Sequence, residues 1–83
     1  MTPTLTLTRA DRTLVLPITL SPRALCDRVV AYPEFDLSAA CAFAGDLAID
    51  NIEYCFIEAN DTWGAYDGVT WRFDGVTPGV ELA

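Results

Sequence analysis

Carboxylates are the most numerous side chains of this chain that can transfer protons. Histidine and lysine are absent, so a proton-transfer site could use only carboxylates, three thiols or three tyrosines. Glu53, Glu58, Asp61 and Asp67 lie close together in the sequence, and two carboxylates held ~5 to 10 Å apart across a cleft hydrolyse glycosidic bonds. A sugar-sized cleft is hard to build in 83 residues. We therefore predict that the protein is not an enzyme, with a small carboxylate-based hydrolase as the least favoured alternative.

The same region offers oxygen ligands for a metal ion. Asn60, Asp61 and Asp67 stand near two glycines, but their spacing does not match the D-x-[DN]-x-[DN]-G loop that holds calcium. Turn formation by Asn and Asp is the better explanation of these residues. We predict neither a metal nor a cofactor.

The three cysteines, Cys26, Cys41 and Cys55, are widely spaced and form no Cys-x-x-Cys pair. They are a poor zinc set, because a structural zinc site normally has four Cys or His ligands. A cysteine nucleophile would also lack its usual histidine partner. We predict reduced, mostly buried thiols in a cytoplasmic protein, with a redox role as a minor alternative. The start MTPTLTLTRA is unlike a signal peptide, and no window approaches the ~20 apolar residues of a membrane span.

Three aromatic residues, Trp63, Tyr66 and Trp71, fall in one short stretch and could stack against a sugar ring or a base. Strand alternation assigns Trp71 to the core. For Trp63 two interpretations remain: it covers a sheet edge, or it stands exposed as an interface anchor, a role in which Trp and Tyr are enriched. The surrounding acids argue against nucleic-acid stacking.

Charge is unevenly distributed along the chain. Twelve acids and five bases give a net charge of -7. Residues 1–28 carry a net charge of +2, whereas residues 29–83 carry ten acids against Arg72 alone and a net charge of -9. This field opposes binding to nucleic acid or to an anionic membrane and favours a basic protein partner. Solubility is the competing explanation of the acidic surplus.

Alternation of leucine with threonine predicts the first two strands. Leu5 and Leu7 lie between threonines, and the period-two pattern resumes after the polar turn at residues 9–12 and continues to Leu20. This pattern is typical of a half-buried hairpin. Pro17 cannot donate to a neighbouring strand, so the second strand should lie at a sheet edge or contain a bulge.

Two helices are predicted to follow. Ser21 and Pro22 form a helix start signal, and the apolar spacing after them predicts a helix that ends at residue 31 or 32, before Pro33. The second helix is predicted to begin at residue 36 or 38 and to run through an alanine-rich segment. It either ends at Gly45 or continues to Asp50, with an interior glycine that costs ~1 kcal/mol.

The C-terminal half is predicted to supply two more strands. The segment IEYCFIEA at residues 52–59 is rich in β-branched and aromatic residues, residues 60–68 form a turn-rich loop, and residues 69–73 form the last strand. Alternation places Val69, Trp71 and Phe73 inward. The tetrapeptide DGVT occurs at 67–70 and again at 74–77, and because Asp-Gly favours tight turns, we interpret both copies as the ends of that strand.

At the level of class, the chain resembles the acidic inhibitors encoded by phages and mobile elements, including anti-CRISPR and anti-restriction proteins. The resemblance rests on a single small domain without lysine or histidine and on acids concentrated in one region. It implies a protein that binds a nucleoprotein machine and blocks it sterically or by mimicking DNA. Carboxylates on a rigid small fold would then imitate a row of phosphates that a partner's Arg and Lys contact.

We expect one domain, residues 1–83, of the α+β class, with an antiparallel sheet of about four strands and two helices on one face in the order ββααββ. The predicted function is binding, as an acidic inhibitor, to a basic groove of a nucleic-acid-binding protein, without direct contact to nucleic acid or membrane. A monomer is favoured over a homo-oligomer. The alternative is a structural or assembly module, such as a phage-particle or self-associating subunit, that packs through the edge strand near Pro17 and the loop aromatics. On position alone, the predicted binding surface comprises Glu53, Glu58, Asp61, Trp63, Tyr66, Asp67 and Asp74.

Overall fold

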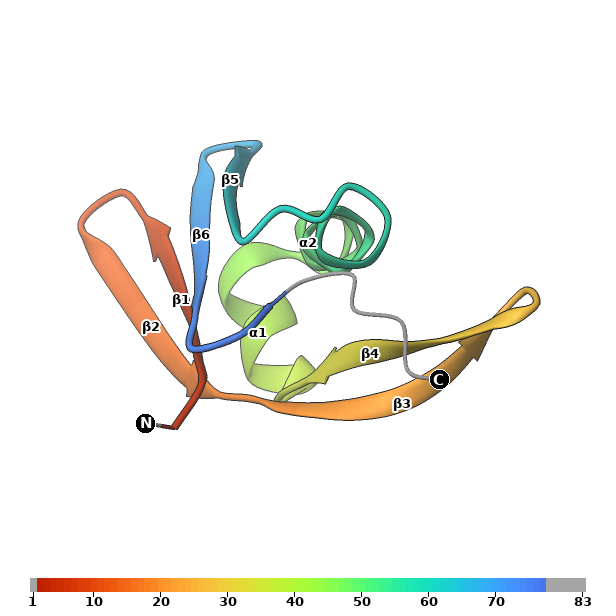
Figure 1. Ribbon diagram of the computed structural model, residues 1–83. Coiled ribbons are helices and arrows are strands. Elements are labelled where there is room, and N and C mark those ends of the chain that lie inside the picture. The colour runs from red at the N-terminus through yellow and green to blue at the C-terminus, as the bar shows by residue number, and fades with distance from the viewer. Residues whose placement is uncertain (1, 78–83) are drawn as a thin grey trace.

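The computed structural model describes residues 2–77 (Figure 1). The elements are β1 (Thr4–Arg9), β2 (Arg12–Pro17), β3 (Thr19–Leu25), β4 (Arg28–Glu34), α1 (Leu37–Ala44), α2 (Asp46–Ile57), β5 (Trp63–Tyr66) and β6 (Val69–Asp74). The class is α+β, as predicted, with all strands antiparallel. The order over the described residues is ββββααββ, because a second hairpin stands where the first helix was expected.

A four-stranded sheet in the order β2-β1-β6-β5 forms one layer of the protein. The predicted first hairpin is confirmed, since β1 pairs with β2 from Thr4 opposite Pro17 to Arg9 opposite Arg12. Its second strand ends at Pro17 and not at Leu20 as predicted, because Thr19 and Leu20 begin β3 of the second hairpin. Pro17 lies on the edge strand, as predicted from its missing donor. Figure 1 shows both helices on the same side of this sheet, which leaves its other face open.

The predicted helix over residues 21–32 is wrong, because this segment forms the two-stranded ribbon of β3 and β4. The tight turn of the ribbon at Cys26 makes Leu25 and Arg28 a hydrogen-bonded pair, and such pairs alternate along the ladder. Pro22 and Pro33 then both fall at positions whose N–H would point away from the partner strand. Within residues 2–77 this sheet has two strands, so the missing N–H groups of Pro22 and Pro33 break no hydrogen bond between strands. The Ser-Pro pair therefore lies in a strand and does not start a helix here.

The helix predicted to begin near residue 36 is confirmed as α1. Asp36 is its N-cap, and its carboxylate accepts a hydrogen bond from the Ala39 N–H at 3.1 Å. Of the two predicted ends, Gly45 is the one observed, and its φ of 93° favours glycine. Gly45 is also the N-cap of α2. The strand predicted at 52–59 is wrong, because α2 extends to Ile57.

The expected loop at 60–68 contains a short strand that sequence analysis missed. β5 pairs with β6, with Tyr66 opposite Val69, and the turn between them is Asp67-Gly68. Both turn residues have positive φ, 48° at Asp67 and 82° at Gly68, as expected for an Asp-Gly hairpin turn. The first DGVT copy is thus a tight turn. The second ends β6 at Asp74, and Gly75 has a φ of 77°.

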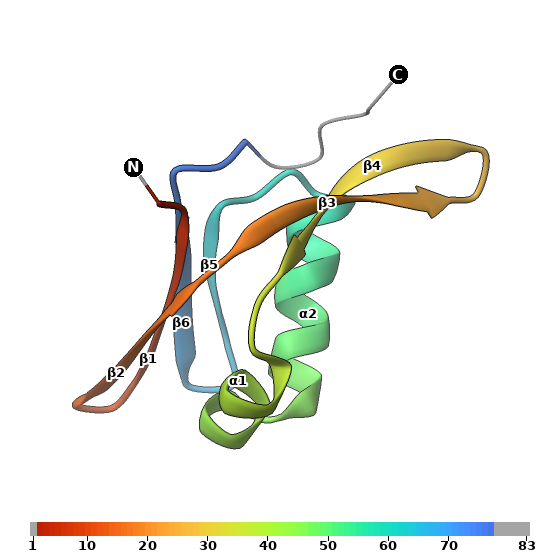
Figure 2. The ribbon, with the colours of Figure 1, turned by 90° about the horizontal axis from the view of Figure 1, so that it is seen from below.

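The core lies between the open sheet and the helices (Figure 2). Val69, Trp71 and Phe73 of β6 point inward, as predicted, and are buried. The ring of Phe73 meets the edge of Phe56 from α2 at a centroid distance of 4.7 Å. α2 contacts both β5 and β4, so it joins the sheet to the ribbon. The ribbon extends beyond this core and gives the described part of the chain its length of 41 Å.

Candidate functional site

The exposed face of α2 is an acidic surface on a regular helix. Counting 100° per residue, Ala48, Ile49, Ile52 and Phe56 lie on one side of the helix, and all four are buried. The opposite side is exposed. It carries Asp46, Leu47, Asp50, Tyr54 and the C-cap residue Glu58.

The α2 face combines carboxylates with two apolar side chains. Leu47 is 72% exposed and Tyr54 is 63% exposed, so both are presented to solvent. Asp46, Asp50 and Glu58 surround them, and at 1.5 Å per residue the carboxylates spread over ~18 Å of helix axis. No basic residue occurs between Asp46 and Glu58. Such a row resembles an acidic binding surface with two apolar contact points.

Glu53 lies at the border between α2 and the ribbon. The hydroxyl of Tyr32 on β4 donates a hydrogen bond to its carboxylate, and the guanidinium of Arg23 on β3 lies 4.5 Å from the centre of the Tyr32 ring. Two shallow hollows of about 240 and 250 Å³ flank this contact. Glu53 is therefore half-buried and already has a partner within the chain.

This environment changes the ionisation of both partners. Burial raises the pKa of Tyr32 to about 12, and the hydrogen bond to Glu53 adds to the shift because it stabilises the neutral phenol. Burial also raises the pKa of Glu53, and the charge of Asp50 acts in the same direction. The hydrogen bond from Tyr32 and the charge of Arg23 oppose this rise. The pair is a structural link between ribbon and helix with a modestly destabilised carboxylate.

All five arginines contact other residues of the chain. Two of them hold α1: Arg9 donates to the carbonyl of Ala44 at 3.0 Å, and Arg12 lies 5.0 Å from the ring centre of Phe43. Arg28 pairs with Glu58 at 3.1 Å. Arg23 stacks on Tyr32 and Arg72 pairs with Asp74, each near its own strand. The bases are thus used internally, whereas most acids stand exposed.

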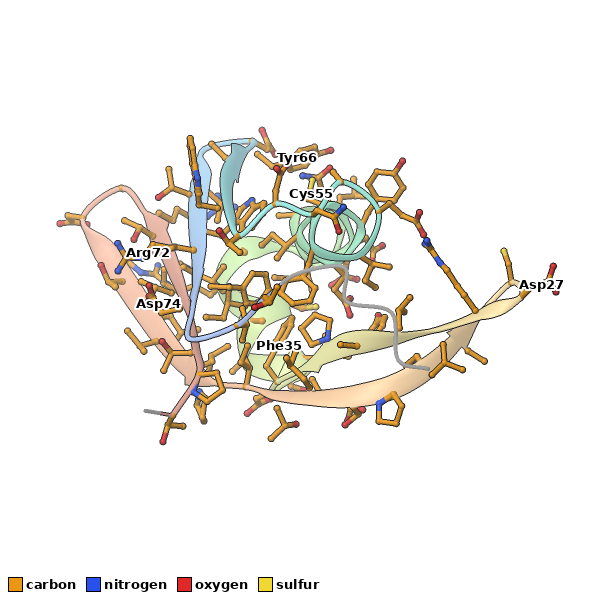
Figure 3. The ribbon with its side chains drawn as sticks, viewed as in Figure 1. Asp27, Phe35, Cys55, Tyr66, Arg72 and Asp74 are labelled. Atoms are coloured by element: carbon orange, nitrogen blue, oxygen red, sulfur yellow. The ribbon has the colours of Figure 1, made fainter. Side chains whose placement is uncertain are left out.

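The predicted binding residues do not form one surface. Glu53, Glu58 and Asp61 lie on α2 or just after it, and the Asp61 N–H donates to the carbonyl of Cys55 at 3.0 Å. Asp67 lies in the β5–β6 turn. Figure 3 shows Tyr66 on the helix side of the sheet, near Cys55, and Asp74 on the other side.

Trp63 belongs to the open face of the sheet. It lies opposite Arg72 in the register of β5 and β6, so their side chains share one face, away from α2. Its side chain is 72% exposed. Of the two interpretations of Trp63, exposure is therefore the one observed, and Trp63 and Tyr66 are presented on opposite faces.

The sequence analysis missed four residues of the α2 face: Asp46, Leu47, Asp50 and Tyr54. A strand at 52–59 would put Tyr54 on the same face as Phe56, whereas in the helix Phe56 is buried and Tyr54 is exposed. The signal was present in the sequence. In a helix that begins at Asp46, one side carries the apolar residues Ala48, Ile49, Ile52 and Phe56. This spacing predicts that the opposite side is exposed to solvent.

The prediction of mostly buried thiols is wrong. All three cysteines are free, Cys26 is exposed at the ribbon tip, and Cys41 and Cys55 are partly exposed. Burial raises the pKa of the Cys41 thiol, with the Asp46 carboxylate adding to the rise, and burial and Asp61 raise that of Cys55. Both shifts disfavour the thiolate, the form that acts as nucleophile and metal ligand. Within residues 2–77, no three Cys, Asp or Glu side chains are grouped so that they could hold a metal ion.

Comparisons with known proteins give no assignment for this chain. No family model matches it, and no curated protein and no solved structure matches it either. In the described part of the chain, neither helix has the length and apolar character needed to cross a membrane.

Proposed function

We propose that this protein is a binding module that presents the exposed face of α2 to a basic groove of a partner protein, and so inhibits that partner. The observation that carries the proposal is the α2 face itself. It places carboxylates and two exposed apolar side chains on one helix, and residues 46–58 contain no basic residue.

Charge supports a basic partner. Asp46 and Asp50 stand exposed on the α2 face, whereas Glu58 pairs with Arg28, so the face as a whole keeps a net negative charge. Complementary charge accelerates encounter and selects the partner. The three carboxylates of the α2 face are spread over ~18 Å of helix axis, about one per 6 to 9 Å, compared with one phosphate per 3.4 Å along a DNA strand. The helix therefore offers a less dense imitation of a nucleic-acid strand.

The two apolar residues supply what charge alone does not. Exposed ion pairs each contribute ~0 to 1 kcal/mol, whereas a few buried aromatic or large side chains dominate the affinity of most interfaces. Tyr54 and Leu47 are the exposed large hydrophobic residues of α2. We propose that they enter pockets of the partner while the surrounding carboxylates orient the helix.

Competition tests the proposed inhibition. The partner is recovered by affinity capture from the source cell, and binding of labelled nucleic acid to that partner is measured with increasing amounts of this protein. The proposal predicts displacement of the nucleic acid and an affinity that falls steeply with added salt, since exposed charges are screened over ~8 to 10 Å. A captured partner that keeps its nucleic acid at saturating protein would contradict the inhibitor mechanism.

A further inference from the structure

The face of the sheet opposite the helices carries a second surface that the proposed function does not use. Antiparallel register arranges its side chains in cross-strand rows: Val15, Thr6, Arg72 and Trp63 form one row, and Thr13, Thr8, Thr70 and Ala65 form the next. A hollow of about 520 Å³ lies over β1, β6 and β5. It is roughly twice as large as either hollow beside Tyr32, and it falls within the size range of small-molecule sites.

The side chains around this hollow differ in height and chemistry. Thr6, Thr8, Thr70 and Ala65 are short and form its floor, and they offer hydroxyl and methyl groups. Trp63 stands at the edge of the floor, 72% exposed, and presents its indole to solvent. The packing of the core does not need this ring, because the core is filled from the other face of the sheet.

Arg72 lies opposite Trp63 on the neighbouring strand. Its Nε donates to Asp74 at 3.0 Å along the same strand, and Figure 3 shows both side chains on the face away from the helices. Among residues 2–77, no hydrogen bond engages its two terminal amino groups. Asp74 neutralises the charge of Arg72, so the pair presents hydrogen-bond donors and acceptors with no net charge.

We propose that this face is a binding site for a neutral saccharide, with one sugar ring stacked on Trp63. An indole face stacks on an apolar ring surface, and the Arg72–Asp74 pair and the threonine hydroxyls supply the donors and acceptors that sugar hydroxyls require. A phosphorylated or otherwise anionic ligand fits less well, because Arg72 is already neutralised and the chain carries a net charge of -7.

The test is an NMR titration of the ¹⁵N-labelled full chain with cellotriose, maltotriose, laminaritriose and chitotriose in turn. Each trisaccharide is added to about 10 mM, which is tenfold above a Kd of about 1 mM and would nearly saturate a site of that affinity. The proposal predicts saturable shifts of the Trp63 indole N–H and of the amides of β5 and β6 with at least one of them. No shift with any of the four would overturn the proposal. Shifts confined to α2 would do the same.

Variants separate stacking from nonspecific contact. Trp63→Ala is expected to weaken binding by about tenfold or more, equivalent to about 1.4 kcal/mol, because it removes the ring on which the sugar stacks, and Arg72→Gln should also weaken binding. The control Tyr54→Ala removes another exposed aromatic ring, which lies on α2 and not on the open sheet face, and should leave saccharide binding unchanged. Glucose 6-phosphate tests the charge argument: binding tighter than that of the neutral sugars would contradict it.

Discussion

The hydroxyl of Tyr32 on β4 donates a hydrogen bond to the carboxylate of Glu53 on α2. This contact links two segments that were expected to be a helix and a strand, and it connects the ribbon to the rest of the protein. Arg28 and Glu58 make a second link near the end of α2, at 3.1 Å. The position of the α2 face relative to the ribbon therefore depends on polar contacts that are specific in geometry.

Replacing Tyr32 by phenylalanine removes the hydroxyl and keeps the ring on which Arg23 stacks. We expect Tyr32→Phe to lower the free energy of unfolding by about 1 to 2 kcal/mol, because a hydrogen bond to a charged, half-buried acceptor is lost. The measurement is urea denaturation at neutral pH. Tyr54→Phe, at a solvent-exposed site, is the matched control and should change stability by less than about 0.5 kcal/mol. Equal effects in the two variants would contradict the contact.

Glu53 gives the protein a pH dependence of known sign. Its pKa in the folded protein is raised by burial above the ordinary 4.5, so the folded state holds this proton more tightly than the unfolded state does. The contribution of Glu53 to stability is full below 4.5 and is lost as pH rises through the raised pKa.

Unfolding of the natural protein and of Glu53→Gln should therefore be compared between pH 3 and 7. The stability of the natural protein, relative to that of the variant, is expected to fall as pH rises in the acidic range. A relative stability that grows with pH would show that the pKa of Glu53 is lowered instead.

Gly64 is a position where packing forbids a side chain. A Cβ at this position would lie 2.8 Å from Cζ2 of the buried Trp71 ring, closer than carbon atoms approach without repulsion. Gly64→Ala is expected to destabilise the protein by ~1 to 3 kcal/mol through overpacking. Ala65→Ser on the exposed side of the same strand is the control. The measurement is the thermal unfolding midpoint of both variants and of the natural protein. An unchanged midpoint in Gly64→Ala would mean that Trp71 does not lie over this glycine.

The apolar residues of α2 should matter for binding and not for folding. Tyr54→Ala is expected to change stability by less than about 0.5 kcal/mol and to weaken partner binding by about 2 kcal/mol or more, as expected for a central aromatic contact. Val15→Ala removes an exposed apolar side chain from the open sheet face and serves as the control. Calorimetric titration against the captured partner measures both variants. Equal affinity of Tyr54→Ala and the natural protein would exclude Tyr54 from the interface.

Local sequence patterns predict the strands correctly where one face of the strand is buried and the connecting turn is short. The alternation around Leu5 and Leu7, the edge position of Pro17 and the inward face of β6 all follow from the sequence and are confirmed. The N-cap Asp36 is a similar case, because the cap and its hydrogen bond are local.

The two segments whose element type was predicted wrongly share a cause, since each carries signals for both structures. Residues 21–32 have a Ser-Pro start and helical apolar spacing, yet Val29 and Val30 also suit a strand, and the tight turn at Cys26 decides in favour of a ribbon. Residues 52–57 have β-branched and aromatic residues, but burying Ile49, Ile52 and Phe56 together requires a helix. A local turn therefore determined the first segment, and tertiary packing determined the second.

The candidate site depended on the second of these errors. Acids were recognised as the main feature of the C-terminal part, and Glu53, Glu58 and Asp61 do lie along or just after α2. The exposure of Tyr54 and Leu47 can be predicted only when residues 46–57 are recognised as a helix. The division of Trp63 and Tyr66 between two faces follows from the pairing of β5, which its short and polar sequence did not predict.

The central claim is that the α2 face, and not acidity in general, binds the partner. The decisive measurement compares the affinities of two variants of equal net charge for the captured partner: Asp46→Asn with Asp50→Asn on α2, and Asp11→Asn with Asp67→Asn in two exposed turns. We predict that the α2 variant loses about tenfold or more in affinity, equivalent to about 1.4 kcal/mol, and that the turn variant stays close to the natural protein. An equal loss in both, or none in the α2 variant, would contradict the claim.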